Sequence, residues 1–218
     1  MKRTGLLLAI VFTAALANAQ IRFDLGLKGG LNFAHINGHS TVTQDYGSRT
    51  GFHLGAYALI KILKIGIQPE IVFSRQGQSF SYSGQPNFNS NFDYVNIPIM
   101  IKWYLAAGFN LQAGPQFGFL TSAKGDIIKG SQSSTMVSTG QDIKDFVKAS
   151  DVTIGFGFGW DLPLGVNITG RYNLGLSDIN KYTGQSPPQG TVTSLGTVSA
   201  KNQVIQLSIG YRLFKLGK

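Results

Sequence analysis

The most informative stretch of the chain covers residues 92–120 and reads FDYVNIPIMIKWYL, AAG and FNLQAGPQFGFL in turn. On both sides of the AAG segment every second residue is apolar, and a period of two is that of a β-strand. The segment therefore predicts a hairpin whose three-residue turn, residues 106–108, is a type I turn closed by glycine in the left-handed conformation. One face of this hairpin is entirely apolar: Val95, Ile97, Ile99, Ile101, Trp103, Leu105, Phe109, Leu111, Ala113, Pro115, Phe117 and Phe119.

The opposite face of the hairpin is polar or glycine and carries Lys102. A polar second face with a lysine is ill placed in the core of a β-sandwich, so the apolar face must meet something other than a second sheet. Lipid is the predicted neighbour.

The same alternation recurs in six further segments, at about residues 22–33, 52–60, 65–73, 151–161, 166–174 and 204–214. The connections between the eight segments alternate between long polar stretches and turns of about three residues. An even strand number lets the sheet close, which removes the edges that lipid could not satisfy. The sequence therefore predicts an all-β fold, an eight-stranded antiparallel up-and-down transmembrane β-barrel with short periplasmic turns and long outer loops.

The long connections are expected to be irregular loops over residues 37–49, 77–91, 122–150 and 177–201. Within the third of them, Ile143, Phe146 and Val147 have the i, i+3, i+4 spacing of an amphipathic helix. That spacing predicts a short helix over about residues 141–148, which would cap the rim of the barrel.

The first 19 residues have the features of an export signal. Lys2 and Arg3 precede an apolar run, and Ala17-Asn18-Ala19 has the small-x-small form of a signal-peptidase site. We expect a signal peptide over residues 1–19, a barrel domain over residues 20–218 and a location in the cell outer membrane. No stretch reaches 18 apolar residues, which excludes a helical membrane protein.

The composition narrows the class of partner. The formal net charge is +9, but no helix or aromatic sheet motif carries these charges, so membrane lipid and not nucleic acid is the predicted partner. The chain contains no cysteine, which excludes a disulfide framework. Aromatic residues fall at the expected strand ends and predict two interfacial girdles. Trp103, Phe109, Trp160 and Tyr211 lie at the short-turn or terminal ends, and Phe33, Phe52, Phe73 and Phe119 at the long-loop ends.

Charged residues on the predicted inward faces are balanced, four of each sign. An eight-stranded barrel has an interior only just wide enough for side chains, so these charges should pair and close the lumen. The alternative is an ion-conducting polar path. The predicted register places Glu70 opposite Tyr57 and Arg171 opposite Gly157. The predicted charge network consists of Asp24, Lys28, Glu70, Lys102, Asp151, Asp161, Arg171 and Arg212.

Signals for catalysis, metal binding and cofactors are weak. The GxGxG run at residues 155–159 has the period of a strand and no helix after it, so glycine as a spacer in the lumen is favoured over a dinucleotide loop. His35 and His39 flank the turn pair Asn37-Gly38, which argues against a metal site. His53 on an inward face could work with Ser74 or Ser208, but no nucleophile elbow supports an enzyme. We therefore expect no enzyme activity, catalytic residue, metal or cofactor.

Several motifs resemble the PorT-like outer-membrane β-barrel family of Bacteroidota, within the wider porin family with an outer membrane protein β-barrel domain. They are residues 93–104 (DYVNIPIMIKWY), Ala113-Gly114-Pro115, Gln68-Pro69-Glu70 and Gly210-Tyr211-Arg212. The family usually has glutamate where Asn96 stands. The resemblance implies an outer-membrane barrel in a family that includes secretion-associated members.

These observations favour a structural or interaction role exerted through the extracellular loops, with a lumen closed by the charge network. The alternatives are a porin-like channel for small solutes, a component associated with protein secretion, and a lipid-modifying enzyme. Other envelope or secretion proteins are the candidate protein partners.

Overall fold

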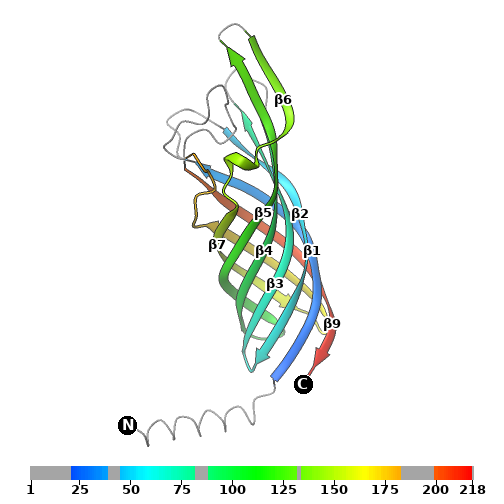
Figure 1. The fold of residues 1–218 in the computed structure, drawn as a ribbon. Helices are drawn as coiled ribbons and strands as arrows, with labels where there is room; N and C mark the ends of the chain where they lie inside the picture. Colours follow the sequence, from blue (N-terminus) through cyan, green and yellow to red (C-terminus); the bar gives the residue numbers. More distant parts are fainter. Residues whose placement is uncertain (1–20, 39–44, 82–87, 132–133, 183–198, 218) are drawn as a thin grey trace, which may run out of the picture.

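Eight antiparallel strands close into a barrel in the computed structural model, with a ninth strand extending above it (Figure 1). The structure describes residues 21–38, 45–81, 88–131, 134–182 and 199–217, so the expected signal peptide and His39 lie outside the described residues. The strands are β1 (Ile21–Gly38), β2 (Asp45–Ile62), β3 (Ile65–Ser81), β4 (Phe88–Tyr104), β5 (Phe109–Ser131), β6 (Ser134–Asp142), β7 (Ser150–Asp161), β8 (Val166–Gly175) and β9 (Ala200–Leu216).

Each barrel strand pairs with its sequence neighbour in the barrel, and β1 pairs with β9 to close the sheet. Strand β5 has 23 residues and serves two structures. Its first half lies between β4 and β7 in the barrel wall, and its second half forms a hairpin with β6. This hairpin projects beyond the end of the barrel opposite to the C-terminus (Figure 1). The predicted eight-stranded closed barrel is confirmed.

The short turns lie where the sequence predicts them, with one difference in turn type. In the β4–β5 turn, Ala107 has φ 50° and Gly108 has φ 84°, and Phe109 N donates to Ala106 O at 2.9 Å. Two consecutive positive φ values are those of a type I′ turn, whereas the predicted type I turn has only the glycine left-handed. The primed turn fits here because its twist matches that of the flanking strands.

The predicted alternation of faces is confirmed in the barrel wall. Ile101 and Trp103 are 56% and 58% exposed, whereas Met100 and Lys102 between them are 0% and 2% exposed. The pattern fails at one end of β9, where the register with β1 shifts between Leu25 and Gly26. The alternation within residues 204–214 predicts that Phe214 points inward like Arg212, but Phe214 pairs with the outward Leu25 and is exposed.

The end of the barrel opposite to the short turns differs most from the prediction. Residues 88–91, 122–131 and 134–142 lie in strands and not in irregular loops, and β3 continues through residues 77–81. The helix expected over residues 141–148 is reduced to one 3₁₀ turn, Lys144–Phe146. No helix within the described ranges is long and apolar enough to cross a membrane.

Two of the three apolar residues of that segment are nevertheless buried, at this end of the barrel. Ile143 and Val147 are 1% and 3% exposed, and Phe146 packs against the same cluster. We call this the outer cluster, which consists of Phe92, Tyr94, Leu120, Ala123, Ile143, Val147, Ile179 and Ala200.

Candidate functional site: the barrel lumen

The middle of the lumen is crossed by a charge clamp centred on Glu70. Lys28 Nζ of β1 donates to Glu70 Oε2 at 3.1 Å. Arg171 of β8 donates to both carboxylate oxygens, from Nη2 to Oε1 at 2.8 Å and from Nη1 to Oε2 at 3.2 Å. All three residues are at most 4% exposed. The clamp therefore joins β1, β3 and β8 across the interior, well out of reach of bulk water.

The strand register around the clamp is the predicted one, and further hydrogen bonds surround Glu70 and Arg171. Glu70 lies opposite Tyr57, and Arg171 lies opposite Gly157, as the sequence predicts. Arg171 also donates from Nη2 to Gln112 Oε1 at 2.9 Å, and Gln68 Nε2 donates to Glu70 Oε1 at 2.8 Å. Glu70 thus receives four hydrogen bonds, the saturation that a buried carboxylate requires.

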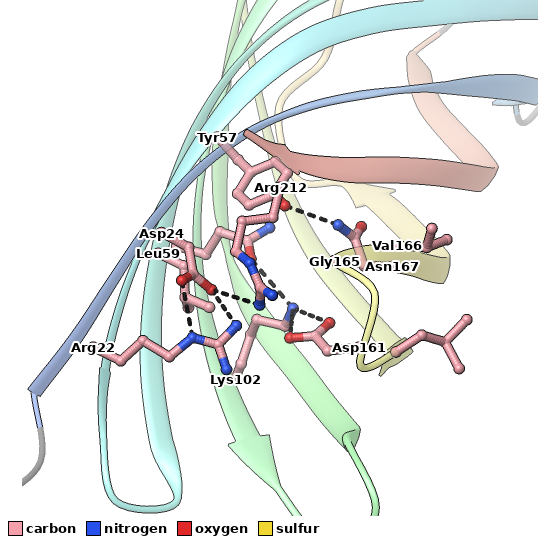
Figure 2. A pocket seen from close by; sticks show the side chains of 12 residues that line it. Arg22, Asp24, Tyr57, Leu59, Lys102, Asp161, Gly165, Val166, Asn167 and Arg212 are labelled. Carbon is pink, nitrogen blue, oxygen red and sulfur yellow. Dashed lines mark hydrogen bonds and ion pairs between the residues drawn. The ribbon is translucent and has the colours of Figure 1, made fainter. Parts of the chain in front are cut away.

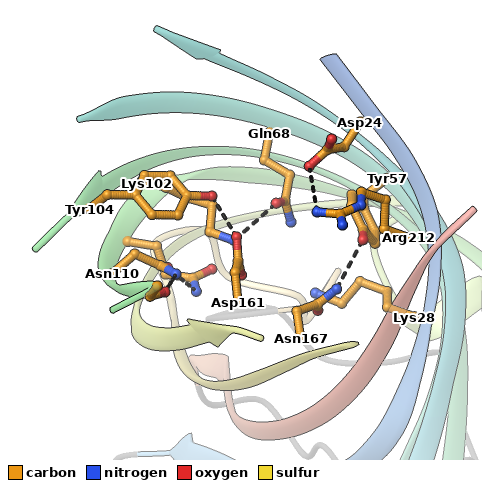
Figure 3. Close-up of polar contacts among 12 residues, drawn as sticks. Asp24, Lys28, Tyr57, Gln68, Lys102, Tyr104, Asn110, Asp161, Asn167 and Arg212 are labelled. Carbon is orange, nitrogen blue, oxygen red and sulfur yellow. Dashed lines mark hydrogen bonds and ion pairs between the residues drawn. The ribbon is translucent and has the colours of Figure 1, made fainter. Parts of the chain in front are cut away.

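A second layer of charge lies nearer the short turns (Figure 3). Lys102 Nζ donates to Asp161 Oδ1 at 3.2 Å, and Tyr104 Oη donates to Asp161 Oδ2 at 2.7 Å. Lys102 Nζ also donates to Gln68 Oε1 at 3.2 Å. Because Gln68 contacts Glu70 as well, this layer and the clamp form one continuous network.

Asp24 completes this layer on the β1 side. Arg22 donates to both of its carboxylate oxygens, and Arg212 Nη1 lies 3.7 Å from Oδ2 (Figure 2). Seven of the eight charges predicted for the lumen therefore take part in an ion pair; Arg22, which sequence reasoning missed, lies next to Asp24 at the strand end.

The eighth residue, Asp151, differs from the prediction. Its carboxylate has no basic partner among the described residues and instead accepts from Ser177 Oγ at 2.6 Å and from Asn202 Nδ2 at 2.8 Å. The reason is its position near the outer cluster, where its register partner on β5 is Gly118. Neutral donors take the place of a cation there.

A neutral polar group lies between the clamp and the outer cluster. His53 Nε2 is 2.8 Å from Ser208 Oγ, and His53 Nδ1 is 2.8 Å from Asn32 Oδ1. Both His53 and Ser208 are in register with Gly30, whose missing side chain lets them meet. The structure thus pairs His53 with Ser208, whereas Ser74 receives a hydrogen bond from Asn32 Nδ2 at 2.9 Å.

The order of serine, histidine and amide matches that of a nucleophile, base and orienting group. However, Ser208 and His53 are 4% and 3% exposed, so a lipid carbonyl has no approach to Ser208 through the closed wall. Asn32 Oδ1 also accepts from Gln206 Nε2 at 3.0 Å, which makes the group part of a wider polar lattice. The arrangement can stabilise the interior by satisfying buried polar atoms.

Similarity to known proteins agrees with this geometry. The sequence matches the family described as outer membrane protein beta-barrel domain over residues 16–181, more than half of the chain. The chain belongs to this family. No curated protein sequence matches it. As a member of the outer membrane protein β-barrel family it resides in the cell outer membrane, and its short turns face the periplasm by the rule for such barrels.

Several solved outer-membrane proteins are similar to the chain in structure. Neisserial surface protein A has a TM-score of 0.50 and 10% identity, covering 87% of this chain and 97% of its own. Ail of Yersinia pestis has a TM-score of 0.45 and 14% identity, covering 88% and 99%. OprG of Pseudomonas aeruginosa has a TM-score of 0.42 and 9% identity, covering 92% and 97%. At 10% identity, the likeness to Neisserial surface protein A shows the fold alone.

In this outer-membrane barrel the predicted periplasmic girdle residues point outward near the short turns. Trp103, Phe109, Trp160 and Tyr211 are between 38% and 58% exposed. The Phe109 and Trp160 rings stack with centroids 4.8 Å apart, and Trp160 Nε1 donates to Ala107 O at 3.1 Å. An apolar ring body with one polar tip suits the boundary between lipid and water.

A cavity of about 10 Å³ lies at the periplasmic mouth of the lumen (Figure 2). Its charged and amide lining comes from Arg22, Asp24, Gln68, Lys102, Asp161, Asn167 and Arg212. Within the described part of the chain no group of three or more histidine, cysteine, aspartate or glutamate side chains is placed to hold a metal ion.

Proposed function

We propose that this outer-membrane barrel is a closed structural or interaction protein that acts through its outer end. The Glu70 clamp carries the proposal, because it fills the middle of an interior already narrow at eight strands. An ion that entered the lumen would have to displace Lys28 or Arg171 from a fully hydrogen-bonded carboxylate. We infer that the outer cluster closes the other end, because its side chains are buried there.

Purified protein reconstituted in planar bilayers is expected to give no stable conductance steps. Its paired charges leave no hydrated path, whereas an identically reconstituted general porin should show regular steps. Large, uniform ohmic steps from the barrel, reproduced in independent bilayers, would reject the closed lumen and favour the channel alternative.

The interaction surface that we propose is the β5–β6 hairpin, since it stands clear of the barrel wall and presents two strands to the exterior. Surface-exposed segments on a rigid scaffold are where binding residues gather. We propose further that the partner is another envelope protein, in line with the resemblance of residues 93–104 to the PorT-like family, which includes secretion-associated members.

A photo-crosslinking amino acid at Lys124, exposed near the base of the hairpin, is expected to capture this partner in cells. The matched control is Leu164, 86% exposed in the periplasmic β7–β8 turn. Adducts of equal yield from both positions, or from Leu164 alone, would contradict an interaction surface at the outer end.

A further inference from the structure

The excess positive charge of the described residues is concentrated at the periplasmic end. The outer end carries eight basic residues and seven aspartates. The basic residues are Arg49, Arg75, Lys124, Lys129, Lys144, Lys148, Lys181 and Lys201, and the aspartates are Asp45, Asp93, Asp126, Asp142, Asp145, Asp151 and Asp178. At the periplasmic end of the described residues, six basic residues face only two carboxylates. The six are Arg22, Lys61, Lys64, Lys102, Arg212 and Lys215, and the two are Asp24 and Asp161.

Both carboxylates at this end are already compensated. Arg22 donates to both oxygens of Asp24. Asp161 accepts from Lys102 Nζ and from Tyr104 Oη. A bound cation would find no free carboxylate in the cavity, which argues that a ligand of this cavity is an anion.

Arg212 is the basic residue of the cavity whose guanidinium is not hydrogen-bonded to a carboxylate. Its nearest ion-pair contact, to Asp24 Oδ2, is 3.7 Å, beyond hydrogen-bond range. Its guanidinium makes no hydrogen bond to another side chain in the described part of the chain. The side chain is 19% exposed and lines the cavity beside Asn167 and Lys102 (Figure 2). A guanidinium that is partly desolvated and lacks hydrogen-bond acceptors is a ready partner for an anion.

We propose that the periplasmic mouth binds one carboxylate group on Arg212. The planar fork of a guanidinium matches the two oxygens of a carboxylate in bidentate geometry. The cavity of about 10 Å³ has room for roughly one water-sized group, so one carboxylate oxygen enters it and the rest of the ligand stays outside. The ligand is therefore either a free small carboxylate or the terminal carboxylate of a peptide in the periplasm.

Saturation-transfer NMR with formate, on the folded protein in deuterated detergent, tests this site. Transfer to formate is expected for the parent and for Lys215→Gln, which removes a charge at the same end but outside the cavity. Arg212→Gln should bind at least about tenfold more weakly, since it loses a charge-assisted bidentate contact. Heat-modifiable gel mobility verifies folding, and Arg212→Lys, which keeps the charge but not the fork, replaces Arg212→Gln if the latter does not fold.

Competition then separates the two sources of the carboxylate. Displacement of formate by N-acetylalanine indicates a peptide terminus, and resistance to it indicates free small carboxylates. No transfer to formate from the parent, or equal transfer from a folded Arg212 variant, would overturn the proposal.

Discussion

Replacing Glu70 with glutamine is expected to lower the free energy of unfolding by about 3 to 5 kcal/mol, the cost of removing one partner from a buried ion pair. Glutamine has nearly the same shape but no charge, so Lys28 and Arg171 would face each other without a counter-ion. Both are at most 4% exposed and have no access to bulk water. Urea unfolding in detergent micelles, followed by heat-modifiable gel mobility, measures the change.

The matched control is Arg75→Gln, which breaks the ion pair with Asp93 at the outer rim. That pair has hydrogen bonds of 2.7 and 2.8 Å, but the Arg75 side chain is 48% exposed. Its loss should cost at most about 1 kcal/mol. If Glu70→Gln were as stable as this control, water must solvate the abandoned cations. A hydrated lumen that also gained preference for anions in bilayer recordings would reject the closed barrel.

The barrel wall could be predicted because lipid and lumen impose opposite demands on alternate residues. Ile101 and Lys102 illustrate this: one is exposed to the membrane and its neighbour is buried inside. The period of two is unambiguous wherever one face meets hydrocarbon. The opposition of Glu70 to Tyr57 follows from the same pattern and the short β2–β3 turn.

The outer end could not be predicted because the pattern disappears there. Above the membrane the outward face of a strand no longer meets hydrocarbon and needs no apolar residues, so residues 122–131 lack the strict alternation and resemble a loop in sequence. In the next segment, the spacing of apolar residues predicted a helix that does not form. Ile143, Phe146 and Val147 fit a helix, yet Ile143 and Val147 are buried in the outer cluster and Phe146 packs against it from a 3₁₀ turn.

The membership of the charge network could be predicted better than its pairings. The alternate strand positions that face the lumen include Lys28, Glu70 and Arg171. Which of these side chains meet depends on how the strands tilt across the closed barrel. Asp151 shows the limit, since its neutral partners Ser177 and Asn202 carry no charge signal in the sequence. The contact between His53 and Ser208 beside Gly30 depends on the β1–β9 register, which closes the barrel. No local sequence pattern predicts this register, because the two strands lie at opposite ends of the chain.

Replacing Ile99 with arginine is expected to destabilise the barrel by about 2 to 4 kcal/mol, the cost of an arginine on the lipid face near the bilayer midplane. Ile99 lies opposite Pro69, points outward and is 39% exposed. It is four residues from Trp103, so an arginine side chain there has a long way to reach the periplasmic interface. Urea unfolding in lipid bilayers of defined thickness measures the loss.

Leu105→Arg is the matched control, because it makes the same change in the same outward direction just past the end of β4. Leu105 is 51% exposed and lies beyond Trp103 on the periplasmic side, where arginine should cost only about 0 to 1 kcal/mol. The difference between the two variants therefore isolates depth in the membrane from the effect of the charge itself. Equal stability of Ile99→Arg and Leu105→Arg would mean that Ile99 does not face the hydrocarbon core, and the predicted position of the membrane along β4 would be wrong.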